Sequence, residues 1–191
     1  SGASNVLGTC NDLEAIAAVV HRYGAWLMVD AAQLLAHRKI SMETTGIDLL
    51  AFSAHKAYAP FGTGVLITRK GLLQFNDTEL KQIKASGEEN PGGIAALGKA
   101  LLILQKIGFE LIESEERKLT GKALREISLI PGIKIHGMLS VEPNGIVGKT
   151  GVIGFTVKST MPLTVARKLA LTGGIGTRYG CLCAHLIIKQ V

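Results

Sequence analysis

Two short apolar runs, each followed by polar side chains that can do chemistry, constrain the fold of this chain more than any other feature. The runs are residues 26–29 and 49–52, and turns or polar residues bound both of them. Short apolar runs of this kind are typical of buried strands. The polar residues at their ends are Asp30, Gln33, Ser53, His55 and Lys56. We therefore expect these side chains to project together from one edge of a sheet.

The rest of the chain alternates between helical and extended patterns, as an α/β architecture requires. The expected strands are 26–29, 48–53, 64–68, 133–136 and 151–157. One helix is expected from Asn11, which forms a capping-box pattern with Glu14, to Gly24. Further helices are expected at 93–107, 108–127 and 162–174. The composition becomes more charged after residue 108, which predicts a domain boundary there.

An acid and a lysine at one sheet edge suit the cofactor pyridoxal phosphate. The amine of Lys56 can hold the cofactor aldehyde as a Schiff base, and Asp30 can pair with the pyridinium nitrogen so that the ring withdraws electrons. Simpler roles stay open for single residues. Asp30 could cap the turn that follows it, Ser53 could bond its own turn, and Cys183 could be a small buried hydrophobe.

Five motifs, in a fixed order along the chain, resemble one enzyme family. They are SNVLGT at 4–9, VDAAQ at 29–33, FSAHK at 52–56, GTGVL at 62–66 and RYGCLCA at 178–184. Together they resemble the class V aminotransferases, closest to the cysteine desulfurase and selenocysteine lyase branch. The resemblance implies a pyridoxal-phosphate-dependent transferase of fold type I, which is aspartate-aminotransferase-like. Residues 1–108 would be the carboxyl-terminal part of the large domain, and residues 109–191 a small α+β domain, incomplete at its end.

The resemblance also implies a role for each residue that would contact the cofactor. Lys56 would form the Schiff base, and Asp30 would meet the pyridine nitrogen. Gln33 would hydrogen-bond the phenolic oxygen of the ring. Ser53 and His55 would hold the phosphate, a task that suits a hydroxyl and a ring N–H.

Three further residues would serve the substrate, again by resemblance. Asn5 would lie near the phenolic oxygen and the substrate carboxylate, and Arg178 would line the same pocket. Cys183 would take sulfur or selenium from the substrate. Relatives of this kind are dimers with the cofactor near the subunit interface, so the implied partners are a small amino-acid substrate, a second copy of the chain and a sulfur-acceptor protein.

Three functions are compatible with these residues. In a cysteine desulfurase, Lys56 removes the α-proton and Cys183 takes the substrate sulfur, with release of alanine. In a class V aminotransferase, the same first steps lead to transfer of the amino group. The third hypothesis is an inert cofactor-binding or assembly module, whose exposed hydrophobic surface would mark an interface.

The resemblance also predicts that parts of the family's site lie outside this sequence. A glycine-rich turn that binds the phosphate, a histidine that stacks on the ring and an arginine that grips the substrate carboxylate are not found. Glu88 stands where relatives often place a threonine that reaches the neighbouring subunit's phosphate, and its charge would repel that group. We expect a carboxyl-terminal portion of an enzyme, cut inside the large domain and again before the end.

Composition excludes several other classes of protein. The 191 residues are 47% hydrophobic, with a formal charge of +6, so a sizeable core is expected. The basic residues are scattered and aromatic residues make up 5%, which argues against nucleic-acid binding. No apolar run approaches the roughly 20 residues needed to span a membrane. The three cysteines, Cys10, Cys181 and Cys183, fit neither a zinc site nor a thioredoxin pair, so reduced, cytoplasmic thiols and no metal are expected.

Residues 145–150 resemble a phosphate-binding loop, but this interpretation is rejected. The segment ends in Gly148, Lys149 and Thr150, but Pro143 occupies the position of the first glycine. A strand, not a helix, is expected to follow, which is the wrong context for a nucleotide loop.

Overall fold

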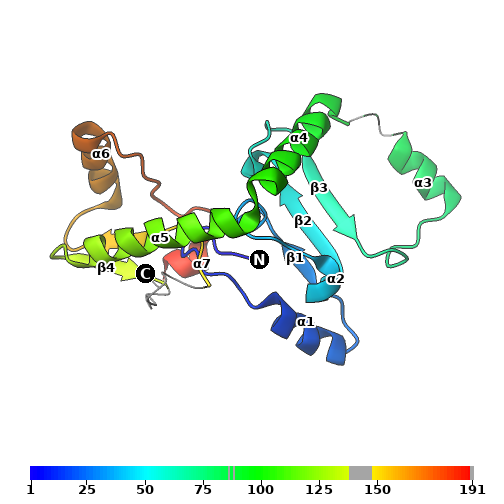
Figure 1. Ribbon diagram of the computed structural model, residues 1–191, viewed down its shortest axis with the longest axis horizontal. Helices are drawn as coiled ribbons and strands as arrows, with labels where there is room; N and C mark the ends of the chain where they lie inside the picture. The colour runs from blue at the N-terminus through cyan, green and yellow to red at the C-terminus, as the bar shows by residue number, and fades with distance from the viewer. Residues whose placement is uncertain (86, 88, 138–147, 190–191) are drawn as a thin grey trace. The chain divides into compact units, whose positions relative to one another are not determined.

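The computed structural model describes residues 1–85, 87, 89–137 and 148–189 (Figure 1). Its contacts divide the chain into two compact units. The first unit comprises Ser1–Ala3 and Asn11–Glu113, and the second comprises Ser4–Cys10 and Ser114–Val191. Glu88 and the first three residues of the 145–150 segment lie outside the described residues.

The first unit contains a sheet of three strands, β1 (Met28–Asp30), β2 (Leu49–Ser53) and β3 (Gly64–Thr68), in that order. β1 is parallel to β2, with Asp30 opposite Ala51, and β3 is antiparallel to β2. Because the carboxyl ends of parallel neighbours meet at one sheet edge, the polar groups that follow β1 and β2 leave the sheet on the same side. This is the arrangement expected from the sequence.

The prediction that these strands are buried is wrong in part. Val29 is buried, whereas Met28 has 57% of its surface exposed and Asp30 is also exposed. Side chains alternate between the two faces of a strand, and within the described unit only the Val29 face of β1 packs into a core. Trp26 precedes β1 and is exposed, and the strand begins two residues later than expected.

Helices connect and flank this sheet. They are α1 (Leu13–Arg22), α2 (Met42–Thr45), the 3-10 helix η1 (Ala54–Ala57), α3 (Asp77–Lys84), α4 (Pro91–Ile107) and the start of α5 (Phe109–Ser128). The N-cap of α1 is Asp12 instead of the expected Asn11, since the Asp12 side chain accepts from the N–H of Ala15 at 3.0 Å. α4 begins two residues before the expected position, because Pro91 suits the first turn of a helix and Asn90 caps it.

A buried carboxylate ties three parts of the first unit together at the amino end of β2. Asp48 is fully buried, and its Oδ2 accepts from the N–H of Leu27 at 2.8 Å and lies 2.7 Å from Nε2 of His21. Its Oδ1 lies 2.9 Å from the Arg69 guanidinium. Burial alone would raise the pKa of Asp48, but the Leu27 N–H, His21 and Arg69 together hold it below its ordinary value. No sequence pattern indicated a role for His21.

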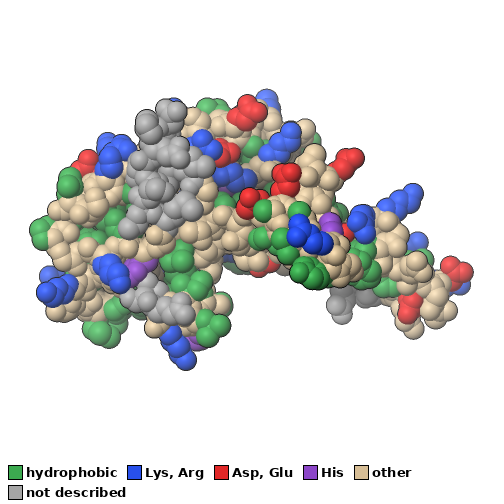
Figure 2. All heavy atoms as spheres, turned by 90° about the horizontal axis from the view of Figure 1, so that it is seen from below, with side chains coloured by type: hydrophobic (Ala, Val, Ile, Leu, Met, Phe, Trp, Pro, Cys, Tyr) green, Lys and Arg blue, Asp and Glu red, His purple; other side chains and the backbone are tan. Residues whose placement is uncertain are grey.

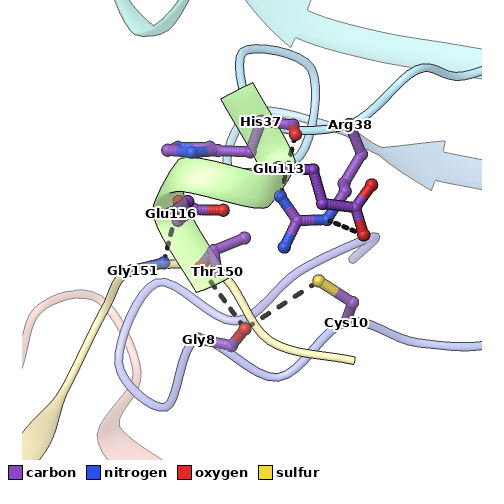
Figure 3. A network of polar contacts seen from close by, with 8 residues as sticks. All are labelled: Gly8, Cys10, His37, Arg38, Glu113, Glu116, Thr150 and Gly151. Atoms are coloured by element: carbon purple, nitrogen blue, oxygen red, sulfur yellow. Dashed lines mark hydrogen bonds and ion pairs between the residues drawn. The ribbon is translucent and has the colours of Figure 1, made fainter. Parts of the chain in front are cut away.

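The second unit contains a two-stranded antiparallel sheet, β4 (Ile133–His136) and β5 (Gly154–Val157), with helices α6 (Pro162–Gly173) and α7 (His185–Ile188) and most of α5. β4 has the expected bounds. β5 starts three residues later than expected, because the N–H of Gly151 donates to Glu116 of α5 at 2.9 Å instead of to a neighbouring strand (Figure 3).

The amino-terminal segment Ser4–Cys10 is held within this second unit by backbone hydrogen bonds. The N–H of Thr150 donates to the carbonyl of Gly8 at 2.8 Å, and the N–H of Cys10 donates to the carbonyl of Gly148 at 2.8 Å. The Thr150 hydroxyl reaches the same Gly8 carbonyl (Figure 3). A segment near the start of the sequence is thus packed against residues about 140 positions away.

Lys149 is almost completely buried in this second unit. Only 1% of its surface is exposed, and its ammonium donates to the carbonyl of Leu7. Burial lowers the pKa of Lys149, while Cys10 acts in the opposite direction. An amine that is bound internally is not presented to a phosphate, which agrees with the rejection of a nucleotide loop here.

Surface features of the described residues are mixed. On the face shown in Figure 2, lysine and arginine side chains are dispersed among acidic and hydrophobic ones and form no single stripe. Within the described ranges, no helix is both long and apolar enough to cross a membrane. Large hydrophobic side chains are exposed at several positions, for example Tyr23, Leu102 and Leu119.

Candidate functional site

The 3-10 helix η1 presents Lys56 to solvent. With three residues per turn, Ala54 and Ala57 fall on one side of η1 and both are buried. They pack with Ala59 and with Leu97 and Ala100 of α4. His55 and Lys56 therefore point away from this core, and Lys56 is exposed. Small alanines at the buried positions let η1 lie close to α4, and this packing fixes the position of the Lys56 backbone.

His55 is held on two sides. Its Nδ1 lies 2.6 Å from the hydroxyl oxygen of Ser53, the last residue of β2. Its ring stacks on Phe61, with 4.5 Å between ring centroids and 19° between planes. These contacts fix the plane of the imidazole and leave its Nε2 edge for another group. If Ser53 donates to Nδ1, the proton of the neutral ring lies on Nε2, which is then a donor.

Asp30 ends β1 and is exposed at the same sheet edge as η1. Its Oδ1 accepts from the N–H of Ala32 at 2.9 Å, so the side chain forms the local turn cap, the simpler of its two expected roles. The second oxygen, Oδ2, is available to a ligand, since a carboxylate can accept with both oxygens. Gln33, three residues later, is half-buried.

The remaining predicted site residues lie in the second unit. They are Asn5, Arg178 and Cys183, and all three are exposed. Exposure of Cys183 does not fit the alternative that it is a small buried hydrophobe. The Nδ2 of Asn5 donates to the carbonyl of Leu182 at 2.8 Å, which brings Asn5 to the residue next to Cys183. The predicted residues thus form two groups, one within each unit.

Sequence reasoning missed several residues that shape these groups. Phe61 is 78% exposed yet stacks on His55, and an exposed aromatic residue six positions after a histidine carries no pattern that would reveal this. The hydroxyl of Thr63 is buried without a hydrogen-bond partner among the described residues. Its backbone carbonyl accepts from the N–H of Ala54, so Thr63 borders η1 directly. The two glycines that flank Thr63 were the available signal.

The first group has the chemistry to hold an anionic cofactor that carries an aldehyde. An exposed amine can react with the aldehyde, a carboxylate at the same sheet edge can pair with a ring N–H, and a hydroxyl with an imidazole can contact a phosphate. Lys56, Asp30, Ser53 and His55 supply these groups in that order. The donor set therefore fits pyridoxal phosphate.

Comparison with known families gives one match over the whole length. The family model described as aminotransferase class-V matches residues 1–191. Among curated proteins, a probable cysteine desulfurase of Halalkalibacterium halodurans is 32% identical over 205 residues, which covers 97% of this chain and 48% of the relative. A cysteine desulfurase of Wigglesworthia glossinidia brevipalpis is 35% identical over 207 residues and is covered to the same extent. The chain spans about half the length of the curated relatives it matches.

Solved structures give the same result. An apo cysteine desulfurase from Thermococcus onnurineus superposes with a TM-score of 0.82 at 27% identity, covering 98% of this chain and 50% of that one. A cysteine desulfurase from Escherichia coli gives a TM-score of 0.81 at 25% identity, with 98% and 49% covered.

Proposed function

Because the chain belongs to the class V aminotransferase family, we propose that it is a portion of a pyridoxal-phosphate-dependent cysteine desulfurase. The observation that carries the proposal is the parallel pairing of β1 with β2, since it brings Asp30 and the turn bearing Lys56 to one sheet edge. The names of the relatives favour desulfuration over other reactions of the family. The mixed α/β fold of the chain agrees with the fold of these relatives.

We also propose that the chain contains parts of two domains. Residues 1–108 are taken as part of a fold type I large domain and residues 109–191 as part of a small α+β domain. The sheet of β4 and β5 with α5 and α6 supports the second assignment. The division by contacts falls after Glu113, within α5.

Five residues of the first unit would hold the cofactor, with Lys56 bonding its aldehyde and Asp30, Gln33, Ser53 and His55 holding the ring and the phosphate. Bound pyridoxal phosphate supplies an aldehyde that reacts with amines and a protonated ring that withdraws electrons from the substrate's α-carbon. Asp30 accepts the ring N–H with Oδ2 and so keeps the proton on the ring nitrogen. His55 donates to the phosphate through Nε2, while the Ser53 hydroxyl donates to Nδ1 and Phe61 keeps the imidazole in place. Gln33 donates to the phenolic oxygen.

Lys56 has a second role after the substrate has bound. Its amine takes up the α-proton of the amino acid as a general base. The exposed position of Lys56 on η1 allows this proton transfer. The buried Ala54 and Ala57 fix the backbone of Lys56, while its amine can move between the cofactor and the substrate.

Cys183 would accept the sulfur of a cysteine substrate. Its thiolate forms a sulfur–sulfur bond while the carbon–sulfur bond of the substrate breaks. The electron pair of the broken bond stays with the substrate carbon, which then takes up a proton. The product, alanine, is released. Asn5 and Arg178 would contact the substrate carboxylate. The exposure of Cys183 supports transfer of its sulfur onward to an acceptor protein.

Further features of the whole protein are proposed from its family. A homodimer is expected, with a small amino acid as substrate. A reducing, cytoplasmic setting is proposed because the reaction needs Cys183 as a thiol. Neither nucleic acid nor a membrane is proposed as a partner.

Replacement of Cys183 separates desulfuration from amino-group transfer. Cys183→Ala should lose nearly all release of sulfide from cysteine in the presence of pyridoxal phosphate and a reductant, because no other residue is proposed to accept the sulfur. Cys181→Ala is the matched control, since Cys181 is also exposed and only two residues away, and should retain release. Full retention of sulfide release by Cys183→Ala would show that Cys183 takes no part in the mechanism. Formation of a keto acid in place of sulfide would favour the aminotransferase hypothesis.

A further inference from the structure

The cysteine loop contains a tight turn with two consecutive residues in the left-handed region. The N–H of Ala184 donates to the carbonyl of Cys181 at 2.8 Å and closes the turn. The central residues, Leu182 and Cys183, have φ of 49° and 58°. This φ pattern is that of a type I′ turn, which favours asparagine and glycine. Leucine and cysteine carry a β-carbon that resists this conformation, so a further contact has to stabilise the turn.

Asn5 supplies such a contact. Its Nδ2 donates to the carbonyl of Leu182 at 2.8 Å, across 177 positions of sequence. That carbonyl belongs to the peptide between the two central residues. A flip of this peptide would convert a type I′ turn into a type II′ turn, in which Cys183 would have a negative φ. The Asn5 hydrogen bond opposes the flip because it holds the carbonyl in its present direction.

The segment that carries Asn5 is itself firmly held. Ser4 Oγ accepts from the N–H of Leu7 at 3.1 Å, and the N–H of Gly8 donates to the carbonyl of Ser4 at 3.0 Å. The buried Lys149 donates to the carbonyl of Leu7 from the body of the second unit. Asn5 therefore projects from a tight loop with fixed ends, as a residue that has to hold a strained turn requires.

We propose that Asn5 is a positioning residue for Cys183, whose amide holds the cysteine turn in its left-handed form and thereby sets the direction of the thiol. The inference rests on the proposed function, in which Cys183 accepts sulfur. A side-chain amide has two N–H donors and one oxygen acceptor. Asn5 thus keeps a donor and an acceptor for the substrate while it holds the turn, and it joins substrate binding to placement of the thiol.

Two substitutions of Asn5 test the proposal without turnover. Asn5→Asp keeps the shape but removes the N–H donor, and Asn5→Ala removes it without adding charge. NMR reports the sign of φ at Cys183, since a positive φ gives a strong nuclear Overhauser effect between a residue's own amide and α protons. Alkylation of Cys183 relative to Cys181, measured by mass spectrometry, reports the accessibility of the thiol with an internal reference.

In both variants the Overhauser signal of Cys183 should weaken, and the alkylation ratio should change about fivefold, which is the effect of one neutral hydrogen bond on an equilibrium. Asn11→Asp is the matched control, because Asn11 also donates through Nδ2 to a backbone carbonyl, that of Ser1, at 2.6 Å. It should leave both readouts unchanged. Leu182→Asn added to Asn5→Ala should restore them, since asparagine favours the first central position of a type I′ turn.

An unchanged Overhauser signal at Cys183 in Asn5→Ala would overturn the proposal, whatever the alkylation ratio does, because the turn would then hold its shape alone. Both readouts need neither cofactor nor substrate. Their failure is therefore distinct from failure of the proposed function, which is judged by sulfide release from Cys183→Ala.

Discussion

At the scale of single residues, two contacts orient the imidazole of His55. Its Nδ1 lies 2.6 Å from the Ser53 hydroxyl oxygen, and its ring stacks on Phe61. Contacts of this kind depend on how a turn closes in space, which residue spacing does not determine. The same holds for the Asn5 contact to Leu182, whose partners are 177 positions apart.

Asp48 shows how one buried residue can govern the response of the first unit to pH. Its folded pKa is depressed below the value of about 3.9 for a free aspartate. A depressed folded pKa contributes stability that is present above the unfolded pKa and is lost as the pH falls through the folded pKa. Protonation of Asp48, which destabilises the fold, therefore takes place only in acid.

Asp48→Asn should lower the free energy of unfolding at pH 7 by about 2 kcal/mol, the typical contribution of hydrogen bonds to a charged group. The difference between wild type and variant should shrink as the pH falls below about 4, where the unfolded aspartate becomes protonated. Urea titrations between pH 7 and pH 3 measure this. A difference that is constant over the range would contradict the role given to the Asp48 carboxylate.

At the scale of elements, the strands and long helices could be predicted from the sequence, whereas the short helices could not. β3 and β4 have the expected bounds because β3 is an apolar run and β4 alternates apolar with polar residues, each next to turn residues. η1 and α2 span only four residues each, too few for a periodic pattern. α3 was missed although Asn76 and Glu79 form a capping box, since its mostly polar sequence has little apolar periodicity.

The amino end of α4 tests the packing that supports η1. A β-carbon at Gly93 would lie 2.1 Å from the Thr63 hydroxyl and 2.6 Å from Asn90 Nδ2. At Gly98, no described atom outside the adjoining helix backbone lies within 4 Å of a β-carbon. Gly93→Ala should destabilise the protein by about 1–3 kcal/mol through overpacking. Gly98→Ala, in the same helix, should stabilise it by up to about 1 kcal/mol through helix propensity.

Thermal unfolding of the two glycine variants, followed by circular dichroism, gives the comparison directly. Equal effects of the two substitutions would show that helix propensity alone decides, and would contradict close packing of α4 against the Thr63 turn.

At the scale of the whole molecule, the order of motifs predicted the family, and the match over residues 1–191 confirms it. The α/β class also followed from alternating patterns. The sequence could not show that Ser4–Cys10 belongs to the second unit, because that segment is held by backbone hydrogen bonds to residues near 150. Such long-range pairing leaves no periodic signal, so the separation of Asn5 from the Lys56 group into different units was not foreseen.

If Lys56 bonds the cofactor aldehyde, reduction of the mixture should attach the cofactor to this residue. The folded chain is mixed with pyridoxal phosphate, reduced with borohydride, digested and mapped by mass spectrometry, with Lys56→Arg as the control. One dominant adduct should form on Lys56 and be absent from the variant. A folded sample with no adduct, or with the cofactor spread equally over other exposed lysines, would contradict it and favour an inert module.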